Sequence, residues 1–374
     1  MEIKFNNLHK QWQEISESVL PKLDEFFESS QYIDGPYLHE FETNFAKYTN
    51  SRYAIGVSNG TDALKLCIQS FNFNGKTNVV MPANTYIADA MAVAHQFRGD
   101  FTITLIDCDD YFQINTRLLE EYLSNNRSKF DNCLLLPVHL YGHPTNMIKI
   151  EELAQTYKCK VMEDASQAHG ARFNSGEMIG GTRSDVCVYS LYPGKNLGAI
   201  GDAGIITTNN HTLYERLKTL RNYGSSKKYY FDDIGWNNRL DPLQAVILDE
   251  KLKFLNQWNE KRRRIASLYN DKLKHLKAVV TPATESGAYH VYHIYCLLVE
   301  CREDLQKYLE EQKIPTVIHY PIPIQLSKPF LYLNKANNTK TLNNAPKLLS
   351  LPMHPYLSDD EVDYICHYIN EFYS

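Results

Sequence analysis

The strongest constraint on this chain is a regular alternation of short apolar runs with longer amphipathic segments over its first two thirds. Val and Ile are frequent in the apolar runs, and most of the runs end in Gly, Pro, Asn or Asp, as strands do. This alternation predicts an α/β fold in which helices cover both faces of a large, mostly parallel sheet. The predicted strands are 52–57, 78–82, 101–107, 133–142, 159–165, 185–192 and 204–209, and the predicted helices include 61–72, 147–158 and 213–223.

The pattern changes near residue 241. Sustained apolar spacing after a proline predicts a long helix, or two in succession, with the charged run Lys261 to Arg264 on its solvent side. We therefore expect a large domain over residues 1–249 and a smaller C-terminal α/β domain over 250–374. The expected elements of the small domain include a strand over 290–300, a helix over 302–313 and a surface loop over 334–344.

Composition excludes several classes of protein. Lys and Arg total 39 against 44 Asp and Glu, and no basic block is present, so we expect no nucleic-acid partner. The N-terminus lacks an apolar signal segment, and no run approaches the roughly 18 apolar residues of a spanning helix. Eight cysteines occur singly and without a C-x-x-C pair, which favours buried reduced thiols over disulfides or a metal site. We expect a cytoplasmic protein without membrane contact.

In a doubly wound sheet, ligands bind at the carboxyl ends of the strands. The first polar segment in such a position, Ser58 to Leu64, follows a predicted strand and opens a helix. Gly60 permits a tight turn there, while Thr61 and Asp62 can cap the helix and leave backbone N–H groups free for a phosphate. The alternative is an ordinary helix cap, which is the better interpretation of this segment alone.

A second candidate is Lys195, which lies in a glycine-rich loop after a predicted strand. A Walker A loop would need Gly at 189 and Ser or Thr at 196, where the chain has Tyr189 and Asn196, and the glycines do not fit G-x-G-x-x-G. Desolvation in a mostly uncharged loop lowers the pKa of an amine and keeps it nucleophilic for Schiff-base chemistry. The alternative is a surface lysine, against which the preceding apolar strand counts.

Glu163 and Asp164 end another predicted strand. Because side chains alternate along a strand, at most one of these carboxylates should face a given pocket. A buried carboxylate can keep a pyridinium nitrogen protonated, but the residues alone do not distinguish Glu163 from Asp164, and a helix cap followed by a loop is as good an explanation. A phosphate site, a carboxylate and a lysine in this order are the three anchors that pyridoxal phosphate needs.

Together with the segments given below, these residues resemble those of a known family. It is similar to the pyridoxal-phosphate-dependent sugar aminotransferases of the DegT/DnrJ/EryC1/StrS family, which have the aspartate-aminotransferase fold (fold type I). The matching segments cover nearly the whole chain in the family's order: 58–64, 81–88, 136–147, 163–171, 190–204, 235–245 and 318–323.

The resemblance implies a role for each matching residue. Lys195 would bond to the aldehyde carbon of the cofactor, pyridoxal 5'-phosphate, and later carry the substrate proton, and Asp164 would pair with the pyridine nitrogen. The implied assembly is a homodimer with shared active sites, in which Asn237 reaches the phosphate from the second subunit. The other implied cofactor contacts are Gln167 at the ring hydroxyl, Tyr86 and Ser166 on the two ring faces, and Gly60, Thr61 and Ser190 at the phosphate.

The segment 222–229, with Tyr192-Pro-Gly, resembles members that act on dTDP-linked 3-keto-6-deoxyhexoses. The implied reaction is amination of the nucleotide-linked keto sugar by L-glutamate, giving a deoxyamino sugar such as those of a lipopolysaccharide O-antigen. The implied substrate contacts are Tyr192, Lys228, His319 and Tyr320. Lys227 can replace Lys228, and a solvated loop is the alternative for both lysines. Gln325 stands where related proteins often have His, so no role is assigned to it.

Other interpretations remain open. The enzyme could aminate a 4-keto nucleotide sugar, or the chain could be a non-catalytic sensor that binds the cofactor or a nucleotide sugar. Dehydratase relatives carry His in place of Lys195, so the lysine argues against that activity. Four histidines in H-x-x-x-H and H-x-x-H patterns lack an acidic or thiol partner at a recognised spacing, so we expect packing or hydrogen bonding rather than metal binding by His139, His143, His290 and His293. His169 is expected to be structural.

Overall fold

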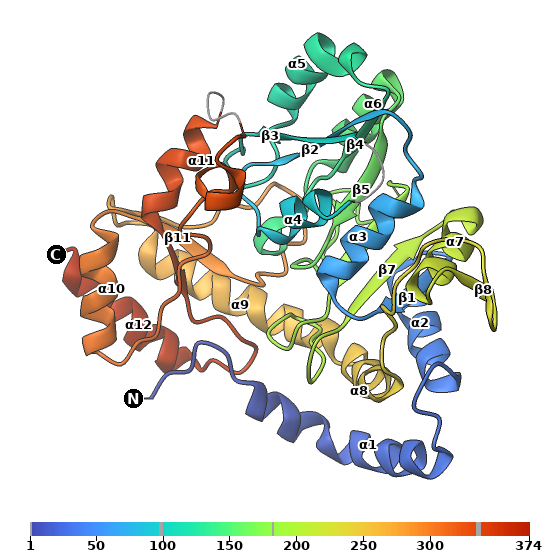
Figure 1. Ribbon diagram of the computed structural model, residues 1–374. Coiled ribbons are helices and arrows are strands. Elements are labelled where there is room, and N and C mark those ends of the chain that lie inside the picture. Colours follow the sequence, from blue (N-terminus) through green and yellow to red (C-terminus); the bar gives the residue numbers. More distant parts are fainter. Residues whose placement is uncertain (1, 97–99, 182, 334–337) are drawn as a thin grey trace.

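Seven strands form the large sheet, in the order β1-β7-β6-β5-β4-β2-β3 (Figure 1). The five strands from β6 to β3 in this order are parallel, whereas β7 is antiparallel to both of its neighbours. The computed structural model describes residues 2–96, 100–181, 183–333 and 338–374. It confirms the predicted α/β fold with a mostly parallel sheet. The strands are β1 (Tyr53–Val57), β2 (Lys76–Pro82), β3 (Asp100–Ile106), β4 (Asn132–Leu135), β5 (Lys160–Asp164), β6 (Val186–Ser190) and β7 (Gly204–Thr208).

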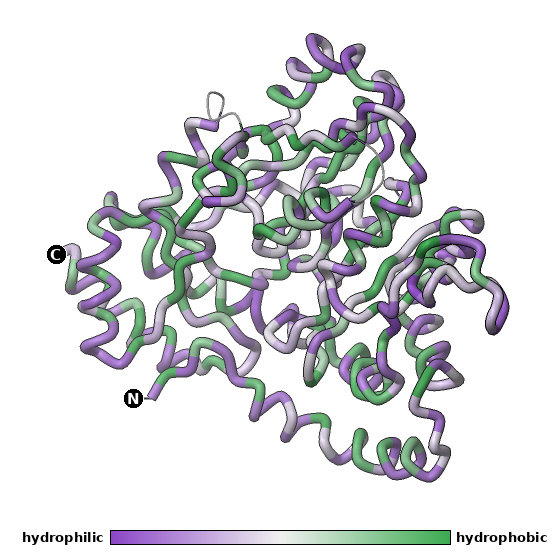
Figure 2. Tube along the Cα trace, viewed as in Figure 1, coloured by the Kyte–Doolittle hydropathy of each residue, from purple (hydrophilic) through white to green (hydrophobic). Residues whose placement is uncertain are grey.

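Helices cover both faces of this sheet because its strands are apolar on both sides. On β5, Val161 packs into one core and Met162 into the other, so each strand contributes to two layers. One core includes residues of α2, α5, α6 and α8, and the other includes residues of α3, α4 and α7. Figure 2 shows the apolar strands inside and hydrophilic stretches on the outer helices. These helices are α2 (Pro36–Thr49), α3 (Gly60–Ser70), α4 (Ala88–Ala94), α5 (Thr116–Asn126), α6 (Met147–Tyr157), α7 (His211–Arg221) and α8 (Pro242–Leu252).

A smaller antiparallel sheet, in the order β10-β11-β12, forms a further core with the C-terminal helices. The region after residue 241 contains two helices in succession, α8 and α9, rather than one long helix. This is one of the two arrangements that the sequence predicted. The domain boundary between residues 249 and 250 stays a prediction. The elements here are β10 (Val279–Val280), β11 (Tyr295–Val299), β12 (Leu348–Leu351), α9 (Leu255–Leu273), α10 (Arg302–Glu311), α11 (Thr339–Asn344) and α12 (Asp359–Phe372).

Three further elements lie outside these layers. The N-terminal helix α1 (Leu8–Ser29) packs along α8, and β8 (Ser225–Lys227) pairs with β9 (Tyr230–Phe231) in a hairpin near α7 (Figure 1). In the described part of the chain, no helix combines the length and apolar character needed to cross a bilayer. Short 3₁₀ turns occur at Arg127–Lys129, Leu140–Gly142, Ile324–Leu326, Lys328–Phe330 and Ala345–Lys347.

Two predicted boundaries were wrong. The strand predicted over 133–142 ends at Leu135, because Pro137 has no N–H for the ladder and the left-handed backbone of Tyr141 (φ 60°) turns the chain. The predicted loop over 334–344 includes helix α11, while residues 334–337 lie outside the described residues. The helix starts there because the Asp107 carboxylate accepts hydrogen bonds from the backbone N–H groups of Lys340 and Thr341 (2.7 and 2.8 Å).

Two predicted exposures were also wrong. Arg262, within the charged run expected on the solvent side of α9, is buried and donates to the carbonyl oxygens of Tyr292 and Met353 (3.3 and 2.9 Å). These acceptors satisfy a guanidinium that would otherwise be costly to bury. All eight cysteines are free, and six are buried as expected, but Cys159 is half-buried and Cys301, at the N-cap position of α10, is exposed.

Candidate active site

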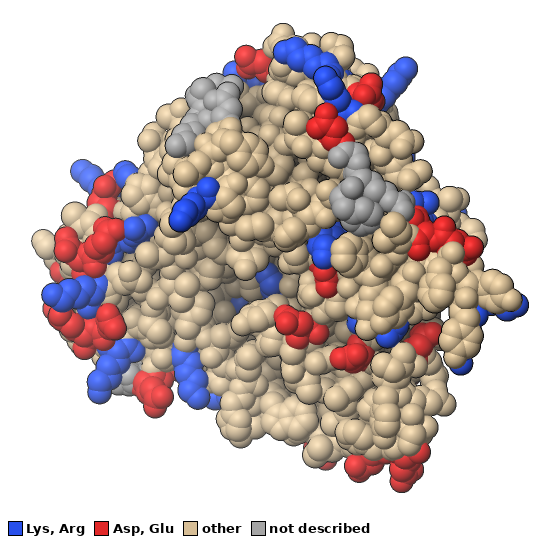
Figure 3. Space-filling view, viewed as in Figure 1, with Lys and Arg blue, Asp and Glu red and all other residues tan. Residues whose placement is uncertain are grey.

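A pocket of about 800 Å³ lies at the carboxyl ends of the parallel strands. The segments that follow β1, β2, β5 and β6 form one side of it, and the segment around His319 forms another. Figure 3 shows this face hollowed near its middle, where most of the surface is uncharged. Eleven of the residues predicted for the site line this pocket: Gly60, Thr61, Tyr86, Asp164, Ser166, Gln167, Ser190, Tyr192, Lys195, His319 and Tyr320.

The start of α3 forms one end of the pocket. Asn59, rather than the predicted Thr61 and Asp62, caps this helix, because its Oδ1 accepts from the N–H of Asp62 (2.8 Å). The helix itself supplies no acceptor for the N–H groups of Gly60 and Thr61. A Cβ at position 60 would lie 2.7 Å from the Cβ of Ser190, so only glycine lets β6 approach this closely. The arrangement suits a bound anion such as a phosphate.

The two carboxylates at the end of β5 face opposite sides of the sheet. Glu163 is buried in a structural network, where its carboxylate contacts His139 Nε2 (2.9 Å) and accepts from Ser184 Oγ (2.5 Å). Asp164 lines the pocket, and its Oδ1 accepts from the N–H of Ser166 (2.8 Å). Asp164 is therefore the carboxylate available to a ligand, whereas Glu163 is already satisfied by the protein.

Among the described residues that line the pocket, Lys195 is the only Lys or Arg. Burial lowers the pKa of its amine to about 8, although the nearby carboxylate of Asp164 favours the protonated form. In the described part of the chain its Nζ has no hydrogen-bond or ion-pair partner within direct reach, while its backbone N–H donates to Tyr192 O (2.9 Å). An amine of lowered pKa, facing a pocket, is suited to nucleophilic and proton-transfer chemistry.

Polar and aromatic groups surround this amine. Gln167 is held on both sides, since its Oε1 accepts from the N–H of Tyr141 (2.7 Å) and its Nε2 donates to the hydroxyl of Tyr320 (3.0 Å). The rings of Tyr320 and Tyr86 are in contact, with centroids 5.3 Å apart. Tyr86 remains about half exposed, so one face of its ring is free for a flat ligand.

Two histidines line the same pocket. Burial and the charge of Lys195 lower the pKa of His319 to about 4, and Ser350 Oγ lies 2.9 Å from its Nδ1. Burial also lowers the pKa of His293 well below its usual value, with a further contribution from Lys195. Both are therefore neutral near pH 7, and can donate or accept hydrogen bonds without adding positive charge.

Sequence reasoning assigned no site role to several lining residues. His293 belongs to a histidine pattern that predicted only packing or hydrogen bonding, and its Nδ1 lies 3.1 Å from Asn196 Oδ1. Phe5 and Asn6 come from the N-terminus, and Met353 follows β12. A backbone hydrogen bond joins these two segments, since the N–H of Met353 donates to Phe5 O (3.4 Å). No local motif marks such distant segments.

The other histidines have structural environments. His139 Nδ1 accepts from the N–H of Thr145 (2.9 Å), and His143 Nε2 accepts from the N–H of Glu285 (3.0 Å). The ring of His290 stacks on that of Tyr292, with centroids 3.8 Å apart. His169 is buried against the ring of Tyr189. These contacts agree with the packing and hydrogen-bonding roles expected from the sequence.

Two predicted contacts are not brought to this pocket by the chain's own fold. Lys228 and its alternative Lys227 are exposed on the β8–β9 hairpin. Asn237 is also exposed, in a bridge to Asn222. The contacts predicted for these residues therefore stay predictions.

Residues 13–370 match the DegT/DnrJ/EryC1/StrS aminotransferase family. The chain belongs to this family. A dTDP-3-amino-3,6-dideoxy-alpha-D-galactopyranose transaminase of Aneurinibacillus thermoaerophilus is 38% identical over 99% of both chains. A dTDP-3-amino-3,4,6-trideoxy-alpha-D-glucose transaminase of Streptomyces venezuelae is 36% identical, with 95% of this chain and 92% of the relative covered. The crystal structure of S. venezuelae DesV in complex with a ketimine intermediate has a TM-score of 0.94 at 33% identity, with 100% and 99% coverage.

The DegT/DnrJ/EryC1/StrS relatives differ in what their names say about substrates. A UDP-N-acetyl-3-dehydro-alpha-D-glucosamine aminotransferase and a GDP-perosamine synthase match at 33% and 31% identity. A protein named only as a pleiotropic regulatory protein matches at 35%. Membership of the family therefore establishes a sugar-nucleotide aminotransferase without fixing the nucleotide or the sugar.

Aminotransferases of the DegT/DnrJ/EryC1/StrS family depend on pyridoxal phosphate, and NtdA of Bacillus subtilis has been solved with bound PMP. The pocket of the present chain fits such a group. Its amine, Lys195, has a lowered pKa and faces the cavity, and Asp164 presents a carboxylate on the same side. At the other end, α3 offers N–H groups beside a glycine where a Cβ would strike Ser190.

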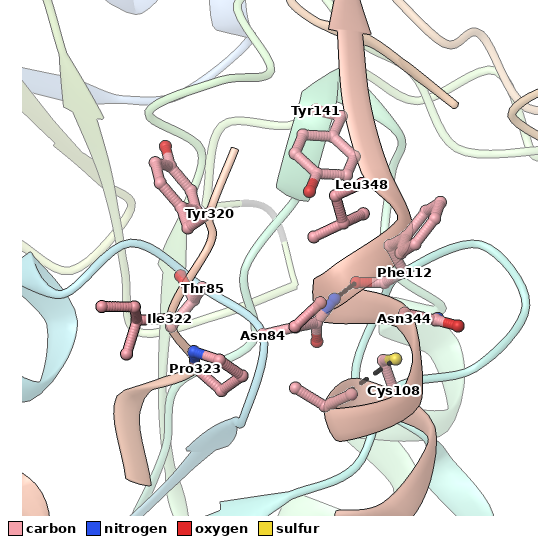
Figure 4. A pocket seen from close by; sticks show the side chains of 12 residues that line it. Asn84, Thr85, Cys108, Phe112, Tyr141, Tyr320, Ile322, Pro323, Asn344 and Leu348 are labelled. Carbon is pink, nitrogen blue, oxygen red and sulfur yellow. Dashed lines mark hydrogen bonds between the residues drawn. The ribbon is translucent and has the colours of Figure 1, made fainter. Parts of the chain in front are cut away.

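A second cavity, of about 20 Å³, lies beside this pocket (Figure 4). Thr85 and Tyr320 line both cavities. Its volume is about that of a single water molecule, and Phe112, Ile322 and Leu348 make part of its wall apolar. The larger pocket is therefore the one that can take a cofactor together with a family substrate.

Proposed function

We propose that this protein transfers the amino group of L-glutamate to C3 of a dTDP-linked 3-keto-6-deoxyhexose. The observation that carries the proposal is the pocket in which Lys195, Asp164 and the start of α3 converge. Two relatives whose names specify dTDP-linked 3-amino sugars, at 38% and 36% identity, support the choice of sugar and nucleotide. Amination at C4 of a nucleotide-linked sugar is the second candidate, since a GDP-perosamine synthase is also related.

Pyridoxal phosphate supplies an electron-withdrawing ring that makes the α-proton of an attached amino acid acidic. Lys195 would take that proton and return it one carbon away, because its lowered pKa makes the neutral amine, which is the base, available near neutral pH. Asp164 would hold the proton on the ring nitrogen, and Gln167 would hold the ring hydroxyl. Gly60, Thr61 and Ser190 would bind the phosphate, while Tyr86 and Ser166 would cover the two ring faces.

A nucleotide diphosphate is an anion, so the number of cationic side chains in the pocket determines how it could be held. Of the described residues that line the pocket, Lys195 is the only Lys or Arg, and its amine would be taken up by the cofactor. We infer that the cations come from a second copy of the chain, through Lys228 or Lys227 on the β8–β9 hairpin. The hairpin is suited to docking, since Tyr229 and Phe231 are 79% and 65% exposed. Asn237 then reaches the phosphate of the partner site, and Tyr192, His319 and Tyr320 contact the sugar.

A substrate panel tests the proposal. The purified protein is loaded with pyridoxal phosphate, and L-glutamate is added alone, so that bleaching of the cofactor absorption band reports the first half-reaction. The keto sugars linked to dTDP, UDP and GDP are then supplied, and NMR locates the new nitrogen. We expect turnover with the dTDP-linked 3-keto sugar. Nitrogen at C4 would overturn the proposed position, and a band that glutamate does not bleach would favour a passive binding protein.

Matched variants test the shared site. Lys228→Ala should raise the KM for the nucleotide sugar and leave the bleaching by glutamate unchanged. If Lys227 makes the contact instead, Lys227→Ala shows this effect and Lys228→Ala does not, so each variant is the control for the other. Mixing Lys195→Ala with Asn237→Ala should restore part of the activity, because one site of each mixed dimer then keeps both residues. Failure of complementation in confirmed mixed dimers would contradict a role for Asn237 across subunits.

A further inference from the structure

Asp89 is a buried carboxyl directly behind the pocket, in a position that the proposed reaction does not use. It lies on α4, just after the pocket residues Thr85 and Tyr86, and its side chain is fully buried. Its Oδ2 accepts from Thr85 Oγ1 (2.6 Å), and among the described residues its Oδ1 has no conventional donor. A buried carboxylate oxygen without a donor is expensive, so this oxygen requires an explanation.

The group that lies next to Asp89 is Asp164, within hydrogen-bonding reach on β5. Lys195, from the loop after β6, and Tyr320, from the segment before β12, are the other ionisable groups that face it. Burial, followed by the negative charge of Asp164, raises the pKa of Asp89 well above its usual value. Two carboxyls in contact cannot both be ionised cheaply, so one of them carries a proton.

We propose that Asp89 is a positioning residue that stays protonated and donates its hydroxyl hydrogen bond to the carboxylate of Asp164. This assignment rests on the proposed function, in which Asp164 faces the ring nitrogen of the cofactor. It accounts for the lack of a donor at Asp89 Oδ1, because a protonated oxygen is itself the donor. Thr85 meanwhile donates to the other oxygen and fixes the orientation of the carboxyl group.

The arrangement has a chemical consequence for Asp164. An ionised carboxylate has about four acceptor positions, so Asp164 can accept from Ser166 N–H and from Asp89 and still face the ring nitrogen. Asp89 therefore holds the Asp164 carboxylate in the orientation in which it would face the ring nitrogen.

Infrared difference spectroscopy on the cofactor-free protein tests the protonation state directly. The carbonyl stretch of a neutral carboxylic acid should be present in the wild-type protein at pH 7 and absent in Asp89→Asn. This readout requires neither cofactor nor turnover, so it can fail or succeed independently of the proposed function. A wild-type spectrum without a neutral acid band, or with one that persists in Asp89→Asn, would overturn the proposal.

Cofactor binding then tests the positioning role. Asn keeps a hydrogen-bond donor without a charge, so Asp89→Asn should bind pyridoxal phosphate nearly as well as the wild type and keep the pH titration of the visible absorption band. Asp89→Ala removes the donor and should weaken binding about tenfold, the effect of one hydrogen bond to a charged group. If Asp89→Asn weakens binding as much as Asp89→Ala, or if neither does, the proposed hydrogen bond is wrong. Circular dichroism and urea unfolding verify that both variants are folded.

Discussion

The glycine at the start of α3 offers the sharpest test of the cofactor site. In Gly60→Ala, the new methyl carbon would lie 2.7 Å from Ser190 Cβ and 3.1 Å from Ser190 Cα, whereas ordinary contacts begin near 3.4 Å. Because the second contact is with backbone, relief requires a shift of about 0.7 Å between α3 and β6 (3.4 minus 2.7 Å). Overpacking of this kind costs about 1–3 kcal/mol of folding stability.

The same shift weakens the phosphate site. A hydrogen bond of about 2.9 Å lengthened by this amount is lost by the usual geometric criterion. Hydrogen bonds to charged groups contribute about 1.5–3 kcal/mol each, so loss of one of them weakens cofactor binding about tenfold to a hundredfold. Quenching of protein fluorescence on titration with pyridoxal phosphate measures the affinity, and urea unfolding of the cofactor-free protein measures the stability.

Gly194→Ala is the matched control on the same pocket. A Cβ there would meet Tyr192 Cε1 at 3.6 Å and Asn6 Nδ2 at 3.7 Å, which are ordinary contacts. We expect stability within about 1 kcal/mol of the wild type and unchanged cofactor affinity for this variant. The reasoning from close approach is refuted if Gly60→Ala binds the cofactor as the wild type does, or if both variants lose affinity equally.

Three further predictions concern single groups. Lys195→Ala should abolish turnover and prevent borohydride from fixing the cofactor to the protein, as peptide mapping checks; normal turnover would contradict the assignment. Because burial lowers the pKa of Lys195 to about 8 and the neutral amine is the nucleophile, cofactor attachment trapped by borohydride should accelerate with rising pH and level off above about pH 8; a rise that continues to pH 10 would indicate an ordinary lysine. Arg221→Ala breaks a buried ion pair with Glu42 (2.5 Å) and should cost about 3–5 kcal/mol in urea unfolding, against less than about 1 kcal/mol for Lys274→Ala, whose pair with Asp271 is exposed; equal costs would refute this.

Much of the large sheet was predictable because its strands are short apolar runs with clear ends. Where prediction failed, a distant partner decided the outcome. Helix α11 begins where Asp107, more than 200 residues earlier in the chain, accepts from the N–H groups of Lys340 and Thr341. Arg262 is buried because carbonyl groups of two other segments surround it. Such tertiary contacts leave no trace in local spacing.

The candidate site likewise contains residues that local pattern predicts and residues that only tertiary packing places there. Alternation along β5 predicted that only one of its two carboxylates would face a pocket, and the structure identifies Asp164 as that residue. His293 and Met353 reach the pocket through the packing of the small sheet. Their local sequence therefore does not predict a place in the pocket. The opposite case is Lys228 on the β8–β9 hairpin, to which the resemblance assigns a substrate contact although the residue does not line the pocket.

Because Glu163 and Asp164 on β5 face opposite sides of the sheet, the register of this strand determines both how the core packs and which carboxylate faces the pocket. A displacement by one residue that brings Glu163, with its longer side chain, to the cavity would leave His139 and Ser184 facing the apolar side chain of Met162. The misaligned state would thus forfeit its interior polar contacts and its catalytic geometry together. The alignment that places Asp164 in the pocket is thus also the one that satisfies Glu163. Exchanging the two residues, Glu163→Asp with Asp164→Glu, should lower both the stability of the protein and its activity.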